Sequence, residues 1–271
     1  MRPTYPHTLI APLICTVIGT LGIFLYFTSA IAEPFAGGTE AQAALARGDF
    51  ATVLQLWRQA ADKGDARAQA NLGFLYHEGQ GVPQDDAEAL KWYRLAAGQG
   101  DASAQQALGS LYREGRGVPQ DLAEAIKWTR LAADQGDAHA QYDLGVMYHD
   151  GKDVKQDYPE ALKWFGKAAE QGQAKAQFFA ASIYFEGNSA TRDLQSARRL
   201  YGLAAKNLPP GELRDTAQTR VGLLLQVDKT TRKAEAGDTE SQYALAVLFG
   251  AKDTLLLDYR ESAKWLAMAA D

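Results

Sequence analysis

Apolar side chains recur along the chain at spacings that fit an α-helix, in a pattern that repeats every 36 residues. Between residues 64 and 79, Ala68, Leu72, Leu75 and Tyr76 lie at i, i+4, i+7 and i+8, which places them on one helix face. The alternation of β-branched and polar residues that is typical of strands is almost absent. The pattern therefore predicts amphipathic helices and no core built on a sheet.

The repeat is visible in the residues themselves. Its first part reads GDARAQANLGFLYHEG at 64–79, GDASAQQALGSLYREG at 100–115, GDAHAQYDLGVMYHDG at 136–151 and GQAKAQFFAASIYFEG at 172–187. Its second part reads GQGVPQDDAEALKW at 79–92, GRGVPQDLAEAIKW at 115–128 and GKDVKQDYPEALKW at 151–164. Such a period indicates a solenoid, in which each unit buries the apolar face of its neighbour.

Each unit is predicted to fold as a first helix, a turn and a second helix. Gly79 and Gly81 end the first helix, because the turn needs a positive φ that glycine adopts at little cost. An aspartate caps the second helix with a glutamate three residues on, in the pairs Asp85–Glu88, Asp121–Glu124, Asp157–Glu160 and Asp258–Glu261. Gly100 ends that helix and Asp101 caps the next, so consecutive helices are expected to be antiparallel neighbours.

Small residues at fixed positions indicate close contacts between helices. Gly73, which recurs as Gly109 and Gly145, is expected to let a neighbouring helix approach. The second helix is expected to bury Ala89, Trp92, Ala96 and Ala97 and their equivalents Ala125, Trp128, Ala132 and Ala133. The five tryptophans are interpreted as core residues instead of a ligand box: Trp57, Trp92, Trp128, Trp164 and Trp265.

The runs A-x-A-Q-x-x-L-G-x-x-Y, G-x-G-V, D-x-x-E-A-x-x-W and A-A-x-x-G resemble the Sel1-like repeat family, whose members are relatives of tetratricopeptide arrays. The resemblance implies an all-α, right-handed α-α superhelical solenoid of helix-turn-helix repeats. In such arrays the first helices line a concave surface, and that surface usually binds partners.

The expected organisation follows the repeat and its irregularities. Gly237-Asp238 comes 65 residues after Gly172 instead of two full periods, so one unit is short. The last unit ends without a polar capping helix, which leaves a face for solvent, a partner or a continuation. We expect a signal peptide or N-terminal membrane anchor at 1–32, a linker at 33–40, an N-terminal half repeat at 41–63, four Sel1-like repeats at 64–207, a degenerate short repeat at 208–236 and a C-terminal repeat at 237–271.

The first segment has the features of an export signal. No residue from Thr8 to Ala32 is charged, and Ala30-Ile31-Ala32 before Glu33 fits a signal peptidase site. The alternative is an uncleaved anchor at 8–31. The repeats are therefore expected to be periplasmic or secreted, or else anchored to the inner membrane and held outside the cytoplasm. The only cysteine, Cys15, lies in this segment, so the repeats can form no disulfide.

Charge and motifs limit the possible functions. The net charge is −5, and removal of 1–32 with its one formal charge, Arg2, makes it −6. A mildly acidic domain without a basic stripe does not favour nucleic acid, and a membrane contact is expected only through an uncleaved N-terminal segment. His77 and His149 are two units apart, too far to share a metal ion, and are interpreted as solvated or partner-facing. We expect no catalytic, cofactor-binding or metal-binding residues.

These observations lead to the hypothesis of a non-enzymatic exported scaffold or adaptor of the bacterial cell envelope, which binds protein partners through its concave face. The alternatives are cell-wall glycan or peptide binding, or a periplasmic hydrolase like the cysteine-rich, β-lactamase-associated Sel1 relatives, whose framework cysteines this chain lacks. Phe178, Phe179 and Phe185 are either a binding hot spot or packing under the irregular fifth unit. The predicted partner-binding residues are Arg67, Asn71, Phe74, His77, Arg113, His139, Tyr142, Asp143, His149, Phe178, Phe179 and Phe185.

Overall fold

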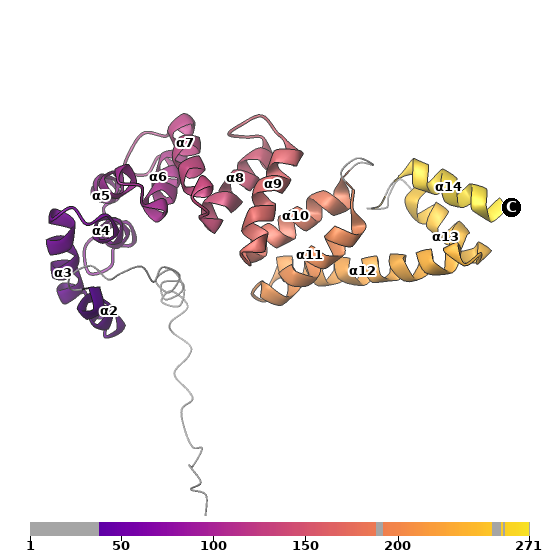
Figure 1. Cartoon of the computed structure of the whole chain (residues 1–271), viewed down its shortest axis with the longest axis horizontal. Coiled ribbons are helices and arrows are strands. Elements are labelled where there is room, and N and C mark those ends of the chain that lie inside the picture. Colours follow the sequence, from indigo (N-terminus) through magenta and orange to yellow (C-terminus); the bar gives the residue numbers. More distant parts are fainter. Residues whose placement is uncertain (1–37, 188–191, 251–255, 257, 271) are drawn as a thin grey trace, which may run out of the picture.

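The computed structural model describes residues 38–187, 192–250, 256 and 258–270, and every regular element in that part of the chain is a helix (Figure 1). This confirms the predicted all-α solenoid. The expected signal or anchor segment and Cys15 lie outside the described residues. The helices are α2 (Gly38–Ala46), α3 (Phe50–Asp62), α4 (Ala66–Glu78), α5 (Asp86–Gly98), α6 (Ala102–Glu114), α7 (Leu122–Asp134), α8 (Ala138–Asp150), α9 (Tyr158–Glu170), α10 (Ala174–Glu186), α11 (Leu194–Asn207), α12 (Glu212–Glu235), α13 (Thr239–Gly250) and α14 (Tyr259–Ala270).

The helices form hairpins that stack in chain order along a curved path (Figure 1). Each regular unit pairs a first helix with a second helix, as α4–α5, α6–α7, α8–α9, α10–α11 and α13–α14. The first helices also meet across units, α4 with α6 and α8 with α10, whereas second helices do not approach each other as closely. The first helices therefore line the inner side of the curve. None of the described helices combines the length and the apolar composition that crossing a membrane requires.

The predicted helix ends are confirmed. Asp85 accepts hydrogen bonds from the backbone N–H groups of Ala87 and Glu88, and the other three predicted second-helix caps act in the same way. Asp101 accepts from the N–H of Ala104 at the start of α6. Gly79 ends α4 in the left-handed region at φ 69°, where its N–H donates to the Leu75 carbonyl. These caps satisfy backbone groups that a helix end leaves unpaired.

The recurring glycine of the first helix is a contact point, as predicted. A Cβ placed on Gly73 would lie 2.7 Å from Cδ1 of Tyr93, and the equivalent contacts join Gly109 to Thr129 and Gly145 to Phe165. The residue that fills this seat is at most 5% exposed in each of the four units: Tyr93, Thr129, Phe165 and Tyr201. The seat is therefore a core position of the second helix.

The tryptophans at or just before this seat are less uniformly buried than the sequence predicts: Trp57 aligns with the seat itself, 36 residues before Tyr93, and the other four stand one residue before it. Trp57, Trp164 and Trp265 are at most 3% exposed, which confirms their assignment to the core. Trp92 and Trp128 also pack against the core but are only half-buried, so the prediction that they are buried is wrong. Their rings are covered by cations, Arg58 at 5.5 Å from the Trp92 centroid and Lys127 at 5.1 Å from that of Trp128. They therefore lie at the edge of the helix packing.

A buried glutamine joins each unit to the one before it. Gln141 is 4% exposed, its Nε2 donates to the Ala133 carbonyl at 3.1 Å, and its Oε1 accepts from Gln171 Nε2 at 2.8 Å. Gln69, Gln105 and Gln177 make the equivalent pair of bonds in the other units. Ala133 O, in the last turn of α7, also accepts from the Gly136 N–H at 3.0 Å, so the glutamine adds a second hydrogen bond to a carbonyl at the helix end.

Replacement of Gln141 by leucine is expected to lower the free energy of unfolding by about 1–3 kcal/mol, because the two hydrogen bonds of a buried side chain are lost. Urea denaturation followed by circular dichroism measures the change. The matched control is Gln218→Leu, which replaces an exposed glutamine on the helix α12 and for which we expect less than about 1 kcal/mol. Equal losses for the two variants would contradict the role of the buried glutamine.

The chain departs from the regular unit at its two ends. The helix α2 begins at Gly38, inside the segment 33–40 that was expected to be a linker. Within 208–236 a single 24-residue helix, α12, replaces the helical hairpin and contacts α11 and α13. It buries a narrow stripe of residues, Ala217, Leu224, Val227 and Ala234. The short fifth unit is thus one long first helix without a second helix of its own.

A long-range contact spans this short unit. Arg192, next to the residue that caps α11, donates from Nη1 to the Leu256 carbonyl at 3.1 Å and lies 3.6 Å from Oδ2 of Asp258, which caps α14. The two charged side chains are only 12% and 13% exposed. The fourth and last units therefore contact each other directly, beside α12.

Candidate interaction surface on the first helices

The variable positions of the first helices form the inner face of the solenoid. Ten of the twelve predicted binding residues are exposed or half-buried there: Arg67, Asn71, Phe74 and His77 on α4, Arg113 on α6, His139, Tyr142, Asp143 and His149 on α8, and Phe179 on α10. A surface of this kind presents side chains that change from unit to unit on a framework that does not.

The exceptions are Phe178 and Phe185, and their predicted partner-binding role is corrected. Phe178 is 8% exposed and Phe185 is 0% exposed, and both belong to the core around α10 and α11. Their rings make edge contacts with Tyr201 at 5.5 and 6.1 Å. They compensate for Ala180, which stands where the other first helices have leucine. The alternative of packing under the irregular unit therefore holds for these two residues.

Side chains from neighbouring first helices meet on the inner face. Gln106 Nε2 on α6 donates to Asp143 Oδ2 on α8 at 3.1 Å. One unit further, Tyr142 on α8 takes the place of Gln106 and Phe179 on α10 takes the place of Asp143, and their rings lie 6.0 Å apart. The inner face therefore changes along the array from a polar contact to an aromatic one.

Around α8 this contact extends into a cluster of aromatic rings. Phe165 is fully buried and stacks on Phe179 at 5.7 Å, and it forms the floor of the cluster. His149 lies 6.0 Å from Phe179 and 5.6 Å from Tyr158, which is 43% exposed. Tyr142, His149 and Phe179 are all half-buried, so each keeps part of its surface at the solvent. We call these three residues the aromatic patch.

A carboxylate in an unfavourable environment lies beside the aromatic patch. Burial raises the pKa of Asp143, and the hydrogen bond from Gln106 and the charges of Arg113 and His139 only partly offset this. Burial also raises the pKa of the neighbouring Tyr142 hydroxyl. A charged group that costs stability in the free protein is a candidate for function, since a partner can supply the missing interactions.

Asp143→Asn is expected to stabilise the protein at neutral pH by about 0.5–1 kcal/mol. A raised folded-state pKa means that stability is greatest with the carboxyl protonated and is lost as pH rises from the unfolded pKa of about 3.9 through the folded value. Asparagine cannot ionise and still accepts from Gln106. Thermal unfolding from pH 4 to 7 measures the effect. The control is Asp153→Asn in the turn between α8 and α9, which removes the same charge. A larger gain for the control would contradict the prediction.

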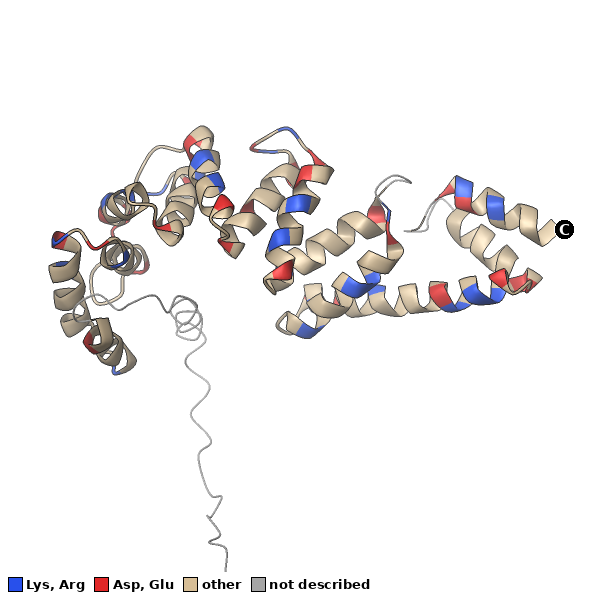
Figure 2. Cartoon of the chain, in the orientation of Figure 1, with Lys and Arg blue, Asp and Glu red and all other residues tan. Residues whose placement is uncertain are grey.

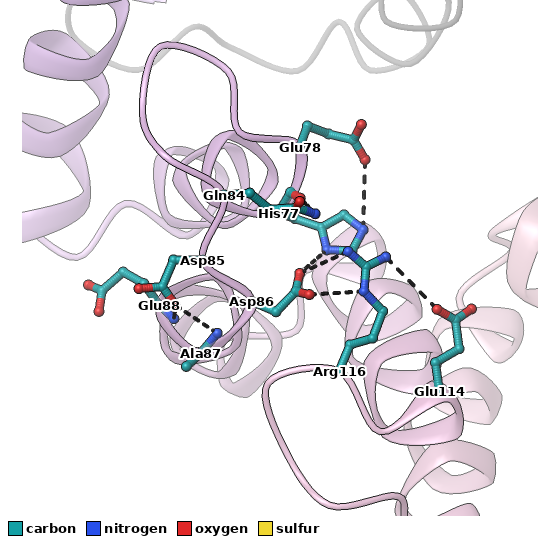
Figure 3. Close-up of polar contacts among 9 residues, drawn as sticks. All are labelled: His77, Glu78, Gln84, Asp85, Asp86, Ala87, Glu88, Glu114 and Arg116. Carbon is teal, nitrogen blue, oxygen red and sulfur yellow. Dashed lines mark hydrogen bonds and ion pairs between the residues drawn. The ribbon is translucent and has the colours of Figure 1, made fainter.

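His77 belongs to a charged contact between units, shown in Figure 3. Its Nδ1 lies 2.7 Å from Asp86 Oδ1, and Arg116 of the next unit approaches Asp86 Oδ2 with Nε at 2.9 Å. His77 and Asp86 are 24% and 20% exposed. The interpretation of His77 as a solvated or partner-facing residue is therefore corrected, because its ring is engaged within the chain. Asp86 has no acidic equivalent in the next units, where Leu122 and Tyr158 stand.

Among the described residues, no three histidine, cysteine or acidic side chains converge as metal ligands would. His77 and His149 each contact a carboxylate of their own unit, Asp86 and Asp150, at 2.7 and 2.8 Å. The inner face offers an aromatic patch, a carboxylate whose pKa is raised by burial and hydrogen-bonding side chains, which suit recognition by contact.

The hairpins stack through contacts that recur from unit to unit, and their inner face varies. These features define an α-solenoid repeat protein. The chain belongs to the Sel1 repeat family, whose model matches residues 54–65, 66–101, 102–137, 138–173, 174–207 and 239–271. Sel1 repeat proteins generally mediate protein–protein interactions.

The solved structures that are similar to the chain include two Sel1-type repeat proteins. A Sel1 repeat protein from Oxalobacter formigenes is 29% identical, with a TM-score of 0.62, over 86% of this chain and 98% of that one. A protective antigen of uropathogenic Escherichia coli strains is 34% identical, with a TM-score of 0.60, over 82% of this chain and 49% of its own. The chain thus spans about half the length of the antigen. No curated protein gives a significant match.

Proposed function

We propose that the protein is a non-enzymatic, exported scaffold of the bacterial cell envelope, which holds a protein partner on the inner face of its solenoid. The observation that carries the proposal is the aromatic patch beside Asp143. Half-buried aromatic side chains next to polar groups are typical of interface hot spots. Here Tyr142, His149 and Phe179 combine with a carboxylate, Asp143, whose burial is only partly offset by its contacts.

The division between constant and variable positions supports a role in binding. The glycine seat, the buried glutamine and the caps recur from unit to unit. The inner-face row Asn71, Ala107, Asp143 and Phe179 contains four different residue types at one structural position. Packing needs the constant positions, so the variable row is available for recognition.

The proposed location rests on the uncharged segment from Thr8 to Ala32. Fusion of alkaline phosphatase after residue 40 tests it, because this enzyme is active only outside the cytoplasm. We expect activity from the native sequence and none after Leu21 and Leu25 are changed to arginine. Activity that survives the double change, or is absent from the native fusion, would contradict export.

A photo-crosslinking amino acid at Val146 tests the binding surface in living cells. Val146 lies on α8 beside the aromatic patch, and we expect it to give a discrete protein adduct that disappears in a Tyr142→Ser, Phe179→Ser variant. The control position is Leu95, which is 53% exposed on the second helix α5. Adducts of equal yield at the two positions would contradict an inner-face site.

The aromatic patch also suits a sugar ring, which favours cell-wall glycan as a second candidate. Co-sedimentation with purified peptidoglycan separates the two. Binding that depends on Tyr142 and Phe179 would support the glycan, and the absence of such binding leaves the protein partner as the occupant.

A further inference from the structure

The charges beside the aromatic patch indicate which kind of partner side chain it fits. Acidic and basic residues are both spread over the whole length of the solenoid, so the charge at any one site is set by its own neighbours (Figure 2). Around Tyr142 these neighbours are mainly acidic. Burial raises the pKa of its hydroxyl, the charges of Asp143 and Asp150 raise it further, and the charge of Arg113 lowers it.

The side chain of Asp143 has one oxygen to which no described residue donates. Gln106 donates to Oδ2 at 3.1 Å, and no other hydrogen bond to this carboxylate forms within the described part of the chain. Arg113 and His139 act on it through their charges, and the charge of Asp137 acts in the opposite direction. Oδ1 is thus left for a donor that a partner brings.

The other charged groups near the patch do not reverse this balance. Asp150 lies 2.8 Å from Nδ1 of His149 and 3.8 Å from Nζ of Lys152, and the lysine side chain is 82% exposed. Arg113 lies 3.8 Å from a carboxylate oxygen of Glu114. With the histidines neutral, the carboxylates outnumber the cations, Asp137, Asp143, Asp150 and Glu114 against Arg113 and Lys152. The site therefore favours an incoming cation over an incoming anion.

Packing does not require a carboxylate at the place of Asp143. Asn71, Ala107 and Phe179 occupy the equivalent position in the other units. An amide there would still accept from Gln106, without the cost of a partly buried charge. A charge that the fold does not need, beside half-buried aromatic rings, is typical of a recognition site.

We propose that the aromatic patch and Asp143 bind a cationic side chain of the protein partner, a lysine or an arginine. This inference rests on the proposed function and names the chemistry of that partner. A cation is attracted by the face of an aromatic ring and by a carboxylate, and the planar guanidinium of arginine can contact both at once. The chain pairs such groups elsewhere: Arg94 lies 5.7 Å from the ring centroid of Tyr112 and donates to its hydroxyl at 2.7 Å.

Nuclear magnetic resonance titration of the purified full chain with two probes tests the proposal. N-acetyl-arginine amide carries the cation, and N-acetyl-citrulline amide has nearly the same shape without the charge. At pH 8, where histidines are largely neutral, we expect the native chain to bind the arginine probe about fivefold more tightly than the citrulline probe. The methyl signals of Val146, beside the patch, report the binding.

Two variants assign the preference to Asp143. Asp143→Asn should reduce it to within about twofold, because the amide keeps the shape of the site and loses the charge. The matched control is Asp62→Asn, which removes an exposed carboxylate at the end of α3 and should leave the preference unchanged. Equal binding of the two probes by the native chain, or a preference that survives in Asp143→Asn, would overturn the inference.

The photo-crosslink at Val146 separates this inference from the proposed function. An adduct that forms in cells while the two probes bind equally would leave the scaffold standing and overturn the cationic side chain. A preference for arginine without any adduct would support the cation site and contradict a protein partner on this surface. When both hold, Asp143→Asn should also lower the yield of the adduct, and Asp62→Asn should not.

Discussion

Replacement of Phe185 by alanine is expected to lower the free energy of unfolding by about 3–5 kcal/mol. The side chain is completely buried, its ring meets that of Tyr201, and the Arg220 guanidinium lies 4.3 Å from its centroid. Truncation therefore leaves a cavity and removes the aromatic face that Arg220 covers. Urea denaturation followed by circular dichroism gives the change, and the partner adduct at Val146 should persist wherever the variant is folded.

The control for Phe185 is Leu95→Ala, which truncates a side chain that is 53% exposed. We expect it to cost less than about 1 kcal/mol. If Phe185→Ala were as stable as this control but lost the partner adduct, Phe185 would belong to the binding surface and its assignment to the core would be wrong.

The local chemistry of the repeat could be predicted from the sequence. Asp85 and its equivalents cap the second helix because a short oxygen-bearing side chain accepts from the first free N–H groups. Gly79 has a positive φ because the turn requires it. Such features depend on a few neighbouring residues, so a motif repeated every 36 residues is sufficient to identify them.

Positions set by the distance between helices were harder to predict. The seat opposite Gly73 is filled by tyrosine, threonine or phenylalanine in different units. The position of Trp92, by contrast, is tryptophan in three consecutive units, which makes it look like the more important core position. The structure shows that the variable position is buried and that Trp92 is half-exposed. A constant residue type was therefore a poor guide to burial in the second helix.

The candidate site shows the same limit. Helical spacing placed Tyr142, Asp143 and Phe179 correctly on the inner face, because that inference needs only the phase of each helix. It could not distinguish Phe179 from its neighbour Phe178, although only Phe178 is buried. The contact of His77 with Asp86 and Arg116 was also missed, since it depends on how two units meet.

The contact across the short unit depends on an arginine without a repeat equivalent. Arg192 precedes the cap Asp193, where the regular units have Gln84, Gln120 and Gln156. Gln84 and its equivalents donate to a carbonyl of their own unit, whereas Arg192 also reaches Leu256 and Asp258 of the last unit. The longer side chain thus compensates for the missing second helix.

Arg192→Met is therefore expected to lower stability by about 3 kcal/mol, because it leaves Asp258 largely buried without its cation. The loss should be local: hydrogen exchange should accelerate in α13 and α14 and stay unchanged in α4 to α9. The control is Arg198→Met, which breaks the more exposed pair with Asp228 between α11 and α12 and should cost about 1 kcal/mol or less. Faster exchange throughout the solenoid, or none in α14, would show that Arg192 does not hold the last unit to the fourth.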